Sequence, residues 1–416
     1  MSKSLYLAGG LLAAALFASA EARAADPQPV GARFRPSNCT NCTQVAPRVA
    51  GATSGAFSVV WDGSSSVDPK GILRRRFNAT GVAQGGDAQV NTDPQLEQTG
   101  GDIAVDPKGN YVVVWASLVG GKNYDIFARR YQANGTAVGS VIQVSADETG
   151  TPTIPQDTAP SVAAGLDGGF VVTWTRSLPA SNTFSGTRPE IWIRRFTPAG
   201  TPVRAQLKLS TSKPSGDRPD VCVDSLNRAV VVWTVVDDYR PFEPSLEGVV
   251  ARRLSPAGAP VGTELVVAAP TSKSANSAVS CGANSTFVAA WQTNQPPALD
   301  RLDIVARRYT RAGTPAGAAF LVNANTEGDQ KIPAIAHDTT GAFIIAWERD
   351  NQAGAGITAR RYSAAGTALS AEIQVDSVPD GALKPEAPSV AGLAAGQFVI
   401  VWQDGKQKLF GQRYKP

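Results

Sequence analysis

Seven tryptophans recur along the chain at nearly even spacing, and this repeat constrains the fold more than any other feature. They are Trp61, Trp115, Trp174, Trp233, Trp291, Trp347 and Trp402. The intervals between them are 54, 59, 59, 58, 56 and 55 residues. Repeats of this length are units that bury their apolar faces against one another, because a single unit cannot do so alone. We therefore expect an array of seven similar units.

The residues that precede each tryptophan repeat as well. Val or Ile stands twelve residues before all seven, and an aromatic residue stands four residues before six of them, with Ala229 as the exception. Gly, Asn or Ser stands six residues before, where Gly and Asn tolerate the backbone of a tight hairpin turn. Each unit reads as four short strands, A to D, of which 159–164, 170–174, 125–131 and 140–144 are examples. Four strands in 50–60 residues describe one blade of a β-propeller.

The two ends of the chain are expected to close the ring. The last unit stops after its third strand, at 410–414, and so lacks an outer strand. The segment 29–34 (PVGARF) matches the outer-strand pattern of 315–320 (PAGAAF). The first strand would complete the last blade, and a closed ring would expose fewer strand edges. The expected architecture is one all-β domain, residues 25–416, forming a seven-bladed propeller with four antiparallel strands per blade.

The N-terminal segment predicts export. Lys3 precedes an apolar run at 5–20, and Ala22-Arg23-Ala24 supplies an A-x-A cleavage pattern, so residues 1–24 are predicted to be a secretory signal peptide. The run is short and rich in small residues for a membrane span. We expect a periplasmic or secreted protein without membrane insertion.

The repeat has a familiar form. Runs such as 159–163 (APSVA) followed by 168–174 (GGFVVTW), together with 304–309 (IVARRY), resemble repeats in large secreted bacterial repeat and adhesin-like proteins. The resemblance covers nearly the whole mature chain. It implies an exported propeller, and it transfers no catalytic residue.

Paired arginines mark the third strand of six units, and Gln412-Arg413 takes their place in the seventh. The pairs are 75–76, 129–130, 194–195, 252–253, 307–308 and 360–361. A basic ring for an acidic polymer is one interpretation, but a feature present in every blade is better explained by blade packing. Alternation sends the two side chains to opposite faces of the sheet, where each can bond a neighbour's carbonyl groups. The net charge of +4 gives no case for nucleic acid.

Four cysteines fit an oxidising compartment. Cys39 and Cys42 favour a local disulfide over a redox dithiol or half of a metal site. Cys222 and Cys281 fall in the inner strands of neighbouring units, so that either a bridge between blades 4 and 5 or two buried thiols is compatible with their positions. His337 is the only histidine and is interpreted as structural. No calcium-loop or nucleophile motif is found, and we expect no metal and no cofactor.

The repeat is least regular on one face of the ring, where the B–C and D–A loops emerge. The B–C loops of blades 3 and 4 carry long insertions, 177–189 and 236–247. Loops on a rigid scaffold commonly carry function, and aromatic residues mixed with charges suit sugar stacking or a protein interface. Thirteen residues before the tryptophans, polar side chains including Ser161 and Ser389 are expected to ring the channel mouth. The candidate ligand-binding residues are Asp237, Asp238, Tyr239, Arg240, Phe242, Glu243, Phe184, Arg48, Asp102 and Asp220.

Three classes of function remain. The leading hypothesis is an exported, non-catalytic binding module for a cell-surface glycan (a carbohydrate partner) or for an extracellular or envelope protein. The alternative is a glycan-cleaving hydrolase or lyase at the channel mouth, with Asp102 and Asp220 as the acid–base pair, since a carboxylate pair is the usual minimum for glycosidic cleavage. The third is a purely structural or assembly protein of the envelope.

Overall fold

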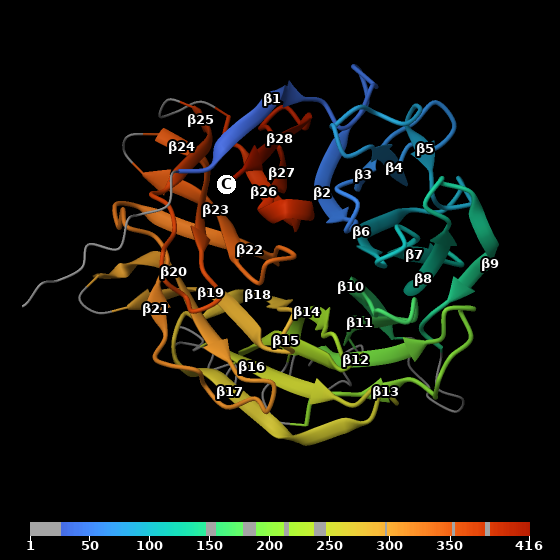
Figure 1. Cartoon of the computed structure of the whole chain (residues 1–416). Coiled ribbons are helices and arrows are strands. Elements are labelled where there is room, and N and C mark those ends of the chain that lie inside the picture. The colour runs from blue at the N-terminus through green and yellow to red at the C-terminus, as the bar shows by residue number, and fades with distance from the viewer. Residues whose placement is uncertain are drawn as a thin grey trace, which may run out of the picture.

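Seven four-stranded antiparallel sheets surround a central axis in the computed structural model (Figure 1). The structure describes residues 26–146, 155–177, 189–211, 216–236, 247–295, 298–351, 354–378 and 383–416. Within these ranges the regular structure is 28 strands and one short 3-10 turn, Ala394–Gly396. The all-β, seven-bladed propeller expected from the tryptophan repeat is confirmed.

The two inner strands of each blade hold most of the core. The strands nearest the axis are β2 (Gln44–Gly51), β6 (Gln98–Val105), β10 (Gln156–Ala164), β14 (Gly216–Val223), β18 (Ala275–Cys281), β22 (Asp329–His337) and β26 (Glu386–Gly392). The second strands, which carry the tryptophans, are β3 (Phe57–Gly63), β7 (Tyr111–Val119), β11 (Phe170–Ser177), β15 (Ala229–Val236), β19 (Phe287–Gln295), β23 (Phe343–Asn351) and β27 (Phe398–Gln403).

The two outer strands complete each blade. The third strands are β4 (Gly71–Phe77), β8 (Asn123–Tyr131), β12 (Pro189–Phe196), β16 (Glu247–Leu254), β20 (Ala298–Tyr309), β24 (Gly354–Tyr362) and β28 (Leu409–Lys415). The outermost strands are β5 (Ala88–Gln89), β9 (Ala137–Gln143), β13 (Leu207–Lys208), β17 (Pro260–Ser272), β21 (Phe320–Leu321), β25 (Ile373–Val378) and, in the seventh blade, β1 (Gln28–Phe34).

The first strand closes the ring, as the sequence predicts. β1 pairs antiparallel with β28, so that Pro29 lies opposite Tyr414 (Figure 1). Arg33 fastens this strand, because its guanidinium lies 5.1 Å from the centre of the Trp402 ring and 3.1 Å from Asp376 Oδ1. The N-terminal strand is therefore part of the last blade.

The tryptophans form the core between blades. All seven are at most 3% exposed. The hydrophobic clusters cross blade boundaries; one of them joins Val112 and Val114 of blade 2 to Phe170 and Trp174 of blade 3. Burial of each tryptophan side chain stabilises the fold by about 2–3 kcal/mol.

Most of the paired arginines bond their blade to a neighbouring one, whereas Arg307 and Arg361 bond groups of their own blades. The first member of a pair reaches back to the preceding blade: Arg129 Nη1 donates to Val90 O at 2.7 Å, and Arg252 Nη1 to Leu209 O at 2.6 Å. The second member reaches forward: Arg130 Nη1 donates to Pro198 O at 2.6 Å. The structural interpretation of the pairs is confirmed.

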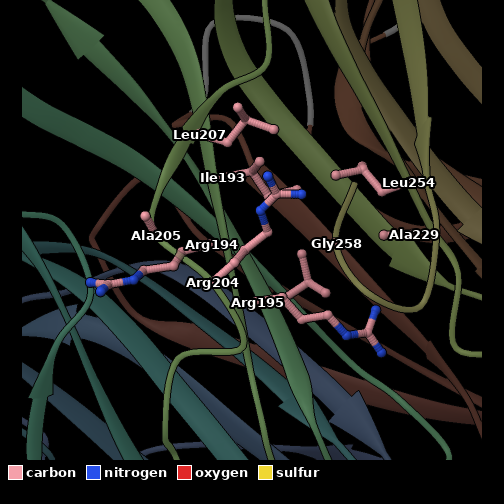
Figure 2. A pocket seen from close by; sticks show the side chains of 10 residues that line it. Ile193, Arg194, Arg195, Arg204, Ala205, Leu207, Ala229, Leu254 and Gly258 are labelled. Carbon is pink, nitrogen blue, oxygen red and sulfur yellow. The ribbon is translucent and has the colours of Figure 1, made fainter. Parts of the chain in front are cut away.

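A narrow crevice between blades 3 and 4 shows this arrangement from close by (Figure 2). Arg194 and Arg195 point away from each other, and Arg195 lies beside Gly258 in the turn of the next blade. Apolar side chains that include Ile193 and Leu254 line the crevice, and the space they leave for water is only about 10 Å³. Glycine recurs at this place because the turn needs a positive φ, and at Gly135 the neighbouring Arg76 also leaves little room for a side chain. The crevice belongs to the blade junction.

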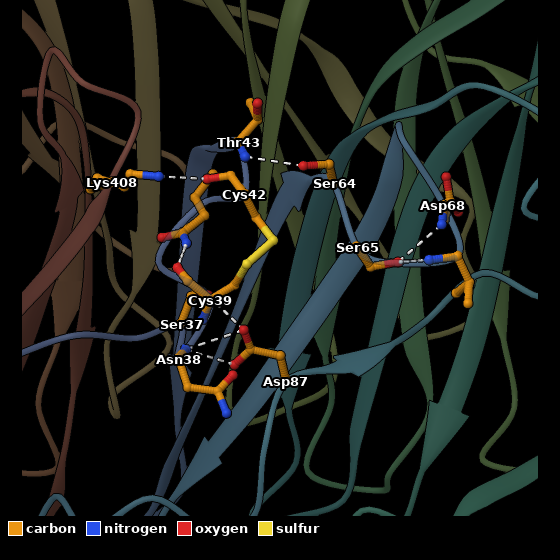
Figure 3. Close-up of a disulfide and its surroundings, with 12 residues drawn as sticks. Ser37, Asn38, Cys39, Cys42, Thr43, Ser64, Ser65, Asp68, Asp87 and Lys408 are labelled. Carbon is orange, nitrogen blue, oxygen red and sulfur yellow. Dashed lines mark hydrogen bonds between the residues drawn. A yellow bond between two sulfur atoms is a disulfide. The ribbon is translucent and has the colours of Figure 1, made fainter.

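Both cysteine pairs form disulfides. Cys39–Cys42 closes the loop between β1 and β2, and Lys408 Nζ of the last blade donates to Cys42 O at 2.9 Å (Figure 3). Cys222–Cys281 joins β14 to β18, which settles the open alternative in favour of a bridge between blades 4 and 5.

The same junction one blade further on uses a hydrogen bond in place of the disulfide. Ser280 and His337 occupy the positions of Cys222 and Cys281, and His337 Nδ1 lies 2.9 Å from Ser280 Oγ. Burial lowers the pKa of His337 to about 4, so the ring is neutral at neutral pH. The interpretation of His337 as structural is confirmed.

Within the described ranges, no helix is long and apolar enough to cross a membrane. The predicted signal peptide, residues 1–24, lies outside these ranges. The two disulfides are typical of a protein that folds in an oxidising compartment.

We predict that the two disulfides contribute unequally to stability. The Cys222–Cys281 bridge spans 59 residues and Cys39–Cys42 only 3, and a longer loop loses more chain entropy when it is closed. Replacing Cys222 and Cys281 by Ala should lower the free energy of unfolding by about 2–4 kcal/mol. The matched double variant at Cys39 and Cys42 should lose less. Urea denaturation followed by tryptophan fluorescence measures both, and equal losses would contradict this account.

Candidate functional site

Every inner strand carries a bulge near its start, on the face where the B–C and D–A loops emerge. One residue in each bulge has a positive φ, and it stands fifteen residues before the tryptophan in all seven blades. These residues are Ala46 (φ 50°), Gly100 (69°), Ala159 (48°), Arg218 (49°), Asn276 (50°), Ile332 (51°) and Ala387 (52°). The strand pairing shifts register at the same places. Bulges re-aim side chains and are common beside active sites.

Side chains from the preceding blade hold four of these bulges. The acceptor is the residue directly after the tryptophan: Gln403 Oε1 accepts from Ala46 N at 2.7 Å, and Glu348 Oε1 accepts from Ala387 N at 2.7 Å. Asp62 and Gln292 act in the same way on Gly100 and Ile332. Sequence reasoning missed these residues, although their fixed place after each tryptophan was a usable signal.

Two residues after each positive-φ residue, the inner strand reaches the wall of the central channel. The inner strands are edge strands of their sheets, so their free N–H groups need partners outside the ladder. Asp102 Oδ2 accepts from Val162 N of the next blade at 2.8 Å, and Asp220 Oδ2 accepts from Val279 N at 2.7 Å. Of the predicted wall residues, Asp102, Ser161, Asp220 and Ser389 each bond to a neighbouring blade, whereas the printed hydrogen bond of Arg48 is to Pro47 O of its own strand.

Asp102 and Asp220 meet across one hydroxyl group, although they belong to blades 2 and 4. Ser161 of blade 3 lies between them: its Oγ donates to Asp220 Oδ1 at 3.0 Å, and the same side chain opposes the rise in the pKa of Asp102 that burial causes. Arg48, from blade 1, is exposed and stabilises the negative charge on Asp102. The structure thus brings together three of the predicted site residues and a serine.

Both carboxyl groups are shifted toward the protonated form. Burial and the charge of Asp102 together raise the pKa of Asp220 to about 6, against the opposing effect of its hydrogen bonds. Burial also raises the pKa of Asp102, while Arg48 lowers it. Two interacting carboxyl groups titrate as a pair, so one proton can be held between them near neutral pH. Acid–base catalysis needs this property.

Two other carboxyl groups with raised pKa values, Asp62 and Glu348, lie nearer the rim of the channel. Burial raises the pKa of Asp62, which accepts bonds from Gly100 and Gly101 and feels the charge of Arg48. Burial also raises the pKa of Glu348, with the charges of Glu386 and Asp350 adding to the effect. These groups hold the bulges.

The remaining predicted residues cannot be placed. Asp237, Asp238, Tyr239, Arg240, Phe242, Glu243 and Phe184 lie outside the described residues. Their part in ligand binding stays a prediction. Among the residues that are described, no group of three or more His, Cys, Asp or Glu side chains is arranged to hold a metal ion.

Comparison with known proteins identifies the architecture. No protein-family model and no curated protein matches the sequence. A protein of unknown function from Dyadobacter fermentans superposes with a TM-score of 0.54 at 12% identity, over 94% of this chain and 99% of that one. An ulvan lyase from a new family of polysaccharide lyases superposes with a TM-score of 0.54 at 9% identity, over 92% of this chain and 95% of that one. The predicted likeness to adhesin-like repeats has no support from these comparisons.

The leading functional hypothesis, a non-catalytic binding module, is contradicted by this result. Ulvan lyase structures share the ring over nearly its whole length, one of them bound to a saccharide of GlcA(1-4)Rha3S units with a TM-score of 0.52, 9% identity and 94% coverage of both chains. A match at this identity establishes the fold, and the reaction must be argued from the site. The binding-module hypothesis was based on the long loops of one face, and the lack of a nucleophile motif counted against an enzyme. A carboxyl pair contributed by two blades leaves no such local motif.

We predict that Asp220 makes stability depend on pH with a defined sign. Its pKa of about 6 in the folded protein exceeds the ordinary value of 3.8, so protonation favours the folded state. The contribution is fully present below about pH 4 and is lost as the pH rises through about 6. Asp220→Asn removes it, so the difference in unfolding free energy between wild type and variant should change by about 1–3 kcal/mol between pH 4 and 7.

Urea denaturation at each pH measures this difference. His337 acts in the opposite direction, because its lowered pKa makes stability fall as the pH drops below 6.5, but both proteins contain it and it cancels. A difference that stays constant from pH 4 to 7 would contradict the raised pKa of Asp220.

Proposed function

We propose that the protein is a glycan-cleaving enzyme whose acid–base pair is Asp220 and Asp102, in the wall of the central channel. The observation that carries the proposal is the meeting of these two carboxyl groups across Ser161, both with raised pKa values. Cleavage of a glycosidic bond needs one group that donates a proton and one that accepts a proton. The pair supplies both within one hydrogen-bonded group.

The two carboxyl groups have different surroundings, and these suggest their roles. Asp220 has a pKa of about 6, raised mainly by burial and also by the charge of Asp102, and suits the proton donor to the leaving oxygen. Asp102 is stabilised as an anion by Arg48 and suits the base. In hydrolysis the base takes a proton from the attacking water; in elimination it takes one from a sugar carbon. Ser161 positions both carboxyl groups.

The location of the pair and the fold support a polymeric substrate outside the cytoplasm. The predicted export signal and the two disulfides agree with such a compartment. Among proteins with this ring, an ulvan lyase has been seen with bound saccharide. A rigid ring that brings groups from several blades to one axis suits catalysis, because the reacting groups are positioned before the substrate arrives.

We predict that Asp220→Asn and Asp102→Asn each lower kcat by at least 100-fold, because each removes one partner in proton transfer. Activity of wild type should decline above about pH 6 as Asp220 loses its proton. The assay is the release of reducing ends from a panel of polysaccharides, with ultraviolet absorbance to detect the unsaturated product of elimination.

The matched control is Asp224→Asn. Asp224 is a buried aspartate in a turn on the opposite face, where it pairs with Arg228 at 2.6 Å. This variant should lose stability and keep kcat. Full turnover by Asp102→Asn on any cleaved substrate would refute the assignment of the base.

A further inference from the structure

The bulge residues at the rim differ sharply from one side of the ring to the other. Four of the seven positive-φ positions hold Gly or Ala, as expected where a side chain is strained. The other three lie in consecutive blades 4, 5 and 6, and we call them the rim arc: Arg218, Asn276 and Ile332. Asn tolerates this backbone, but Arg and Ile are costly there. Strain of this kind is retained where the side chain has a task.

The arginine of the rim arc is held in one orientation. Arg218 Nη1 donates to Asn276 Oδ1 at 2.6 Å, and Asn276 Nδ2 donates to Gln292 Oε1 at 2.9 Å. Gln292 is fixed in turn by the backbone N–H of Ile332, at 3.1 Å. The chain of bonds crosses three blades and ends on a guanidinium whose side chain is 65% exposed. The arginine is therefore preorganised and open to solvent.

Among the described residues, one carboxylate pairs with Arg218, and the separation is long. The carboxylate paired with it is that of the neighbouring Asp217, with Nε and Oδ2 separated by 3.8 Å. That carboxylate is already engaged, since Asp217 Oδ1 accepts from the backbone N–H of Arg218 at 2.7 Å. A guanidinium binds a carboxylate or a sulfate through two parallel bonds, and this match is the chemistry that the rim arc offers.

The position of the rim arc relates it to the acid–base pair. Arg218 precedes Asp220 by two residues on β14, which separates them by roughly 7 Å along the strand. Ile332, 39% exposed, adds an apolar side chain at the far end of the rim arc. A negative charge on the wall carboxyl groups repels an anionic sugar, and Arg218 at the entrance offsets this repulsion together with Arg48.

We propose that the rim arc binds an anionic sugar residue of the substrate, with Arg218 pairing to its carboxylate or sulfate group. This inference rests on the proposed function, because it names the substrate class of the same site: an acidic polysaccharide. The sugar lies with its charged group on Arg218, a hydroxyl group near Asn276 and an apolar face on Ile332. The scissile bond then lies over Asp220.

The test measures dissociation constants for oligosaccharides of matched length: one built of hexuronate, one sulfated and one neutral. The protein is the mature chain carrying Asp102→Asn, so that bound saccharide is not consumed. We expect at least one acidic oligosaccharide to bind tenfold or more tightly than the neutral one, with affinity falling as salt rises. Which acidic arm binds identifies carboxylate or sulfate. Equal affinity for all three would overturn the proposal.

Variants assign the effect to Arg218. Arg218→Gly should weaken binding of the acidic oligosaccharide by tenfold or more, leave the neutral one unchanged, and leave Tm unchanged or raised, because glycine relieves the positive φ. Arg311→Ala removes an exposed arginine from a turn on the opposite face and should change neither affinity. Retained affinity in Arg218→Gly, or a fall in Tm with equal loss for both ligands, would overturn the proposal.

The two proposals fail separately in these experiments. Cleavage of neutral polysaccharides alone would leave the proposed enzyme standing and remove the anionic substrate. Binding of an acidic oligosaccharide through Arg218 without cleavage by wild type would retain the rim arc and refute the acid–base pair.

Discussion

The packing of each tryptophan-bearing blade onto the next is the interaction on which the whole structure depends. Every hydrophobic cluster contains residues of two adjacent blades, so a blade has no core of its own. Its apolar faces are covered only when both neighbours are present, and the first and seventh blades satisfy this condition because β1 completes the ring. The arginine pairs act at the same junctions, where a guanidinium reaches carbonyl groups that the outer strands leave unpaired. The stability of the fold therefore depends on the closure of the ring.

Closure also determines the chemistry of the channel. Seven edge strands face the axis with unpaired N–H groups, and side chains of the adjoining blades must accept them. Asp102 and Asp220 meet this need and are desolvated by the same packing, which raises their pKa values. The groups suited to proton transfer are thus also groups that hold blades together. A substitution there alters both stability and activity, and only a matched buried aspartate elsewhere, such as Asp224, separates the two effects.

The fold could be predicted from the sequence because the same pattern of four strands around a tryptophan recurs seven times. The site could not, for physical reasons. Asp102 and Asp220 stood at equivalent positions in the sequence, but their meeting across Ser161 depends on the curvature of the ring. The bulges left no signal, because their positive-φ residues include Ala, Arg and Ile, which do not mark such a backbone, instead of Gly throughout. The pairing of Cys222 with Cys281 was undecided because the two cysteines differ by one position in register, and the bridge forms between inner strands of neighbouring blades.

The rim and the wall of the channel are under different constraints, and this difference explains how one scaffold accommodates different ligands. At the wall, four polar side chains bond the next blade, namely Asp102, Ser161, Asp220 and Ser389, and replacing any of them removes a contact between blades. At the rim, the bend in the strand is held at four positions by a side chain of the preceding blade, as Gln403 holds Ala46. The residue in the bend contributes only strain and its own side chain, so it can be exchanged without loss of the backbone shape. Alanine at this position has a small side chain. Arg218 adopts the same strained backbone and places a positive charge at the entrance. Specificity can then vary at the rim while the chemistry of the wall is preserved.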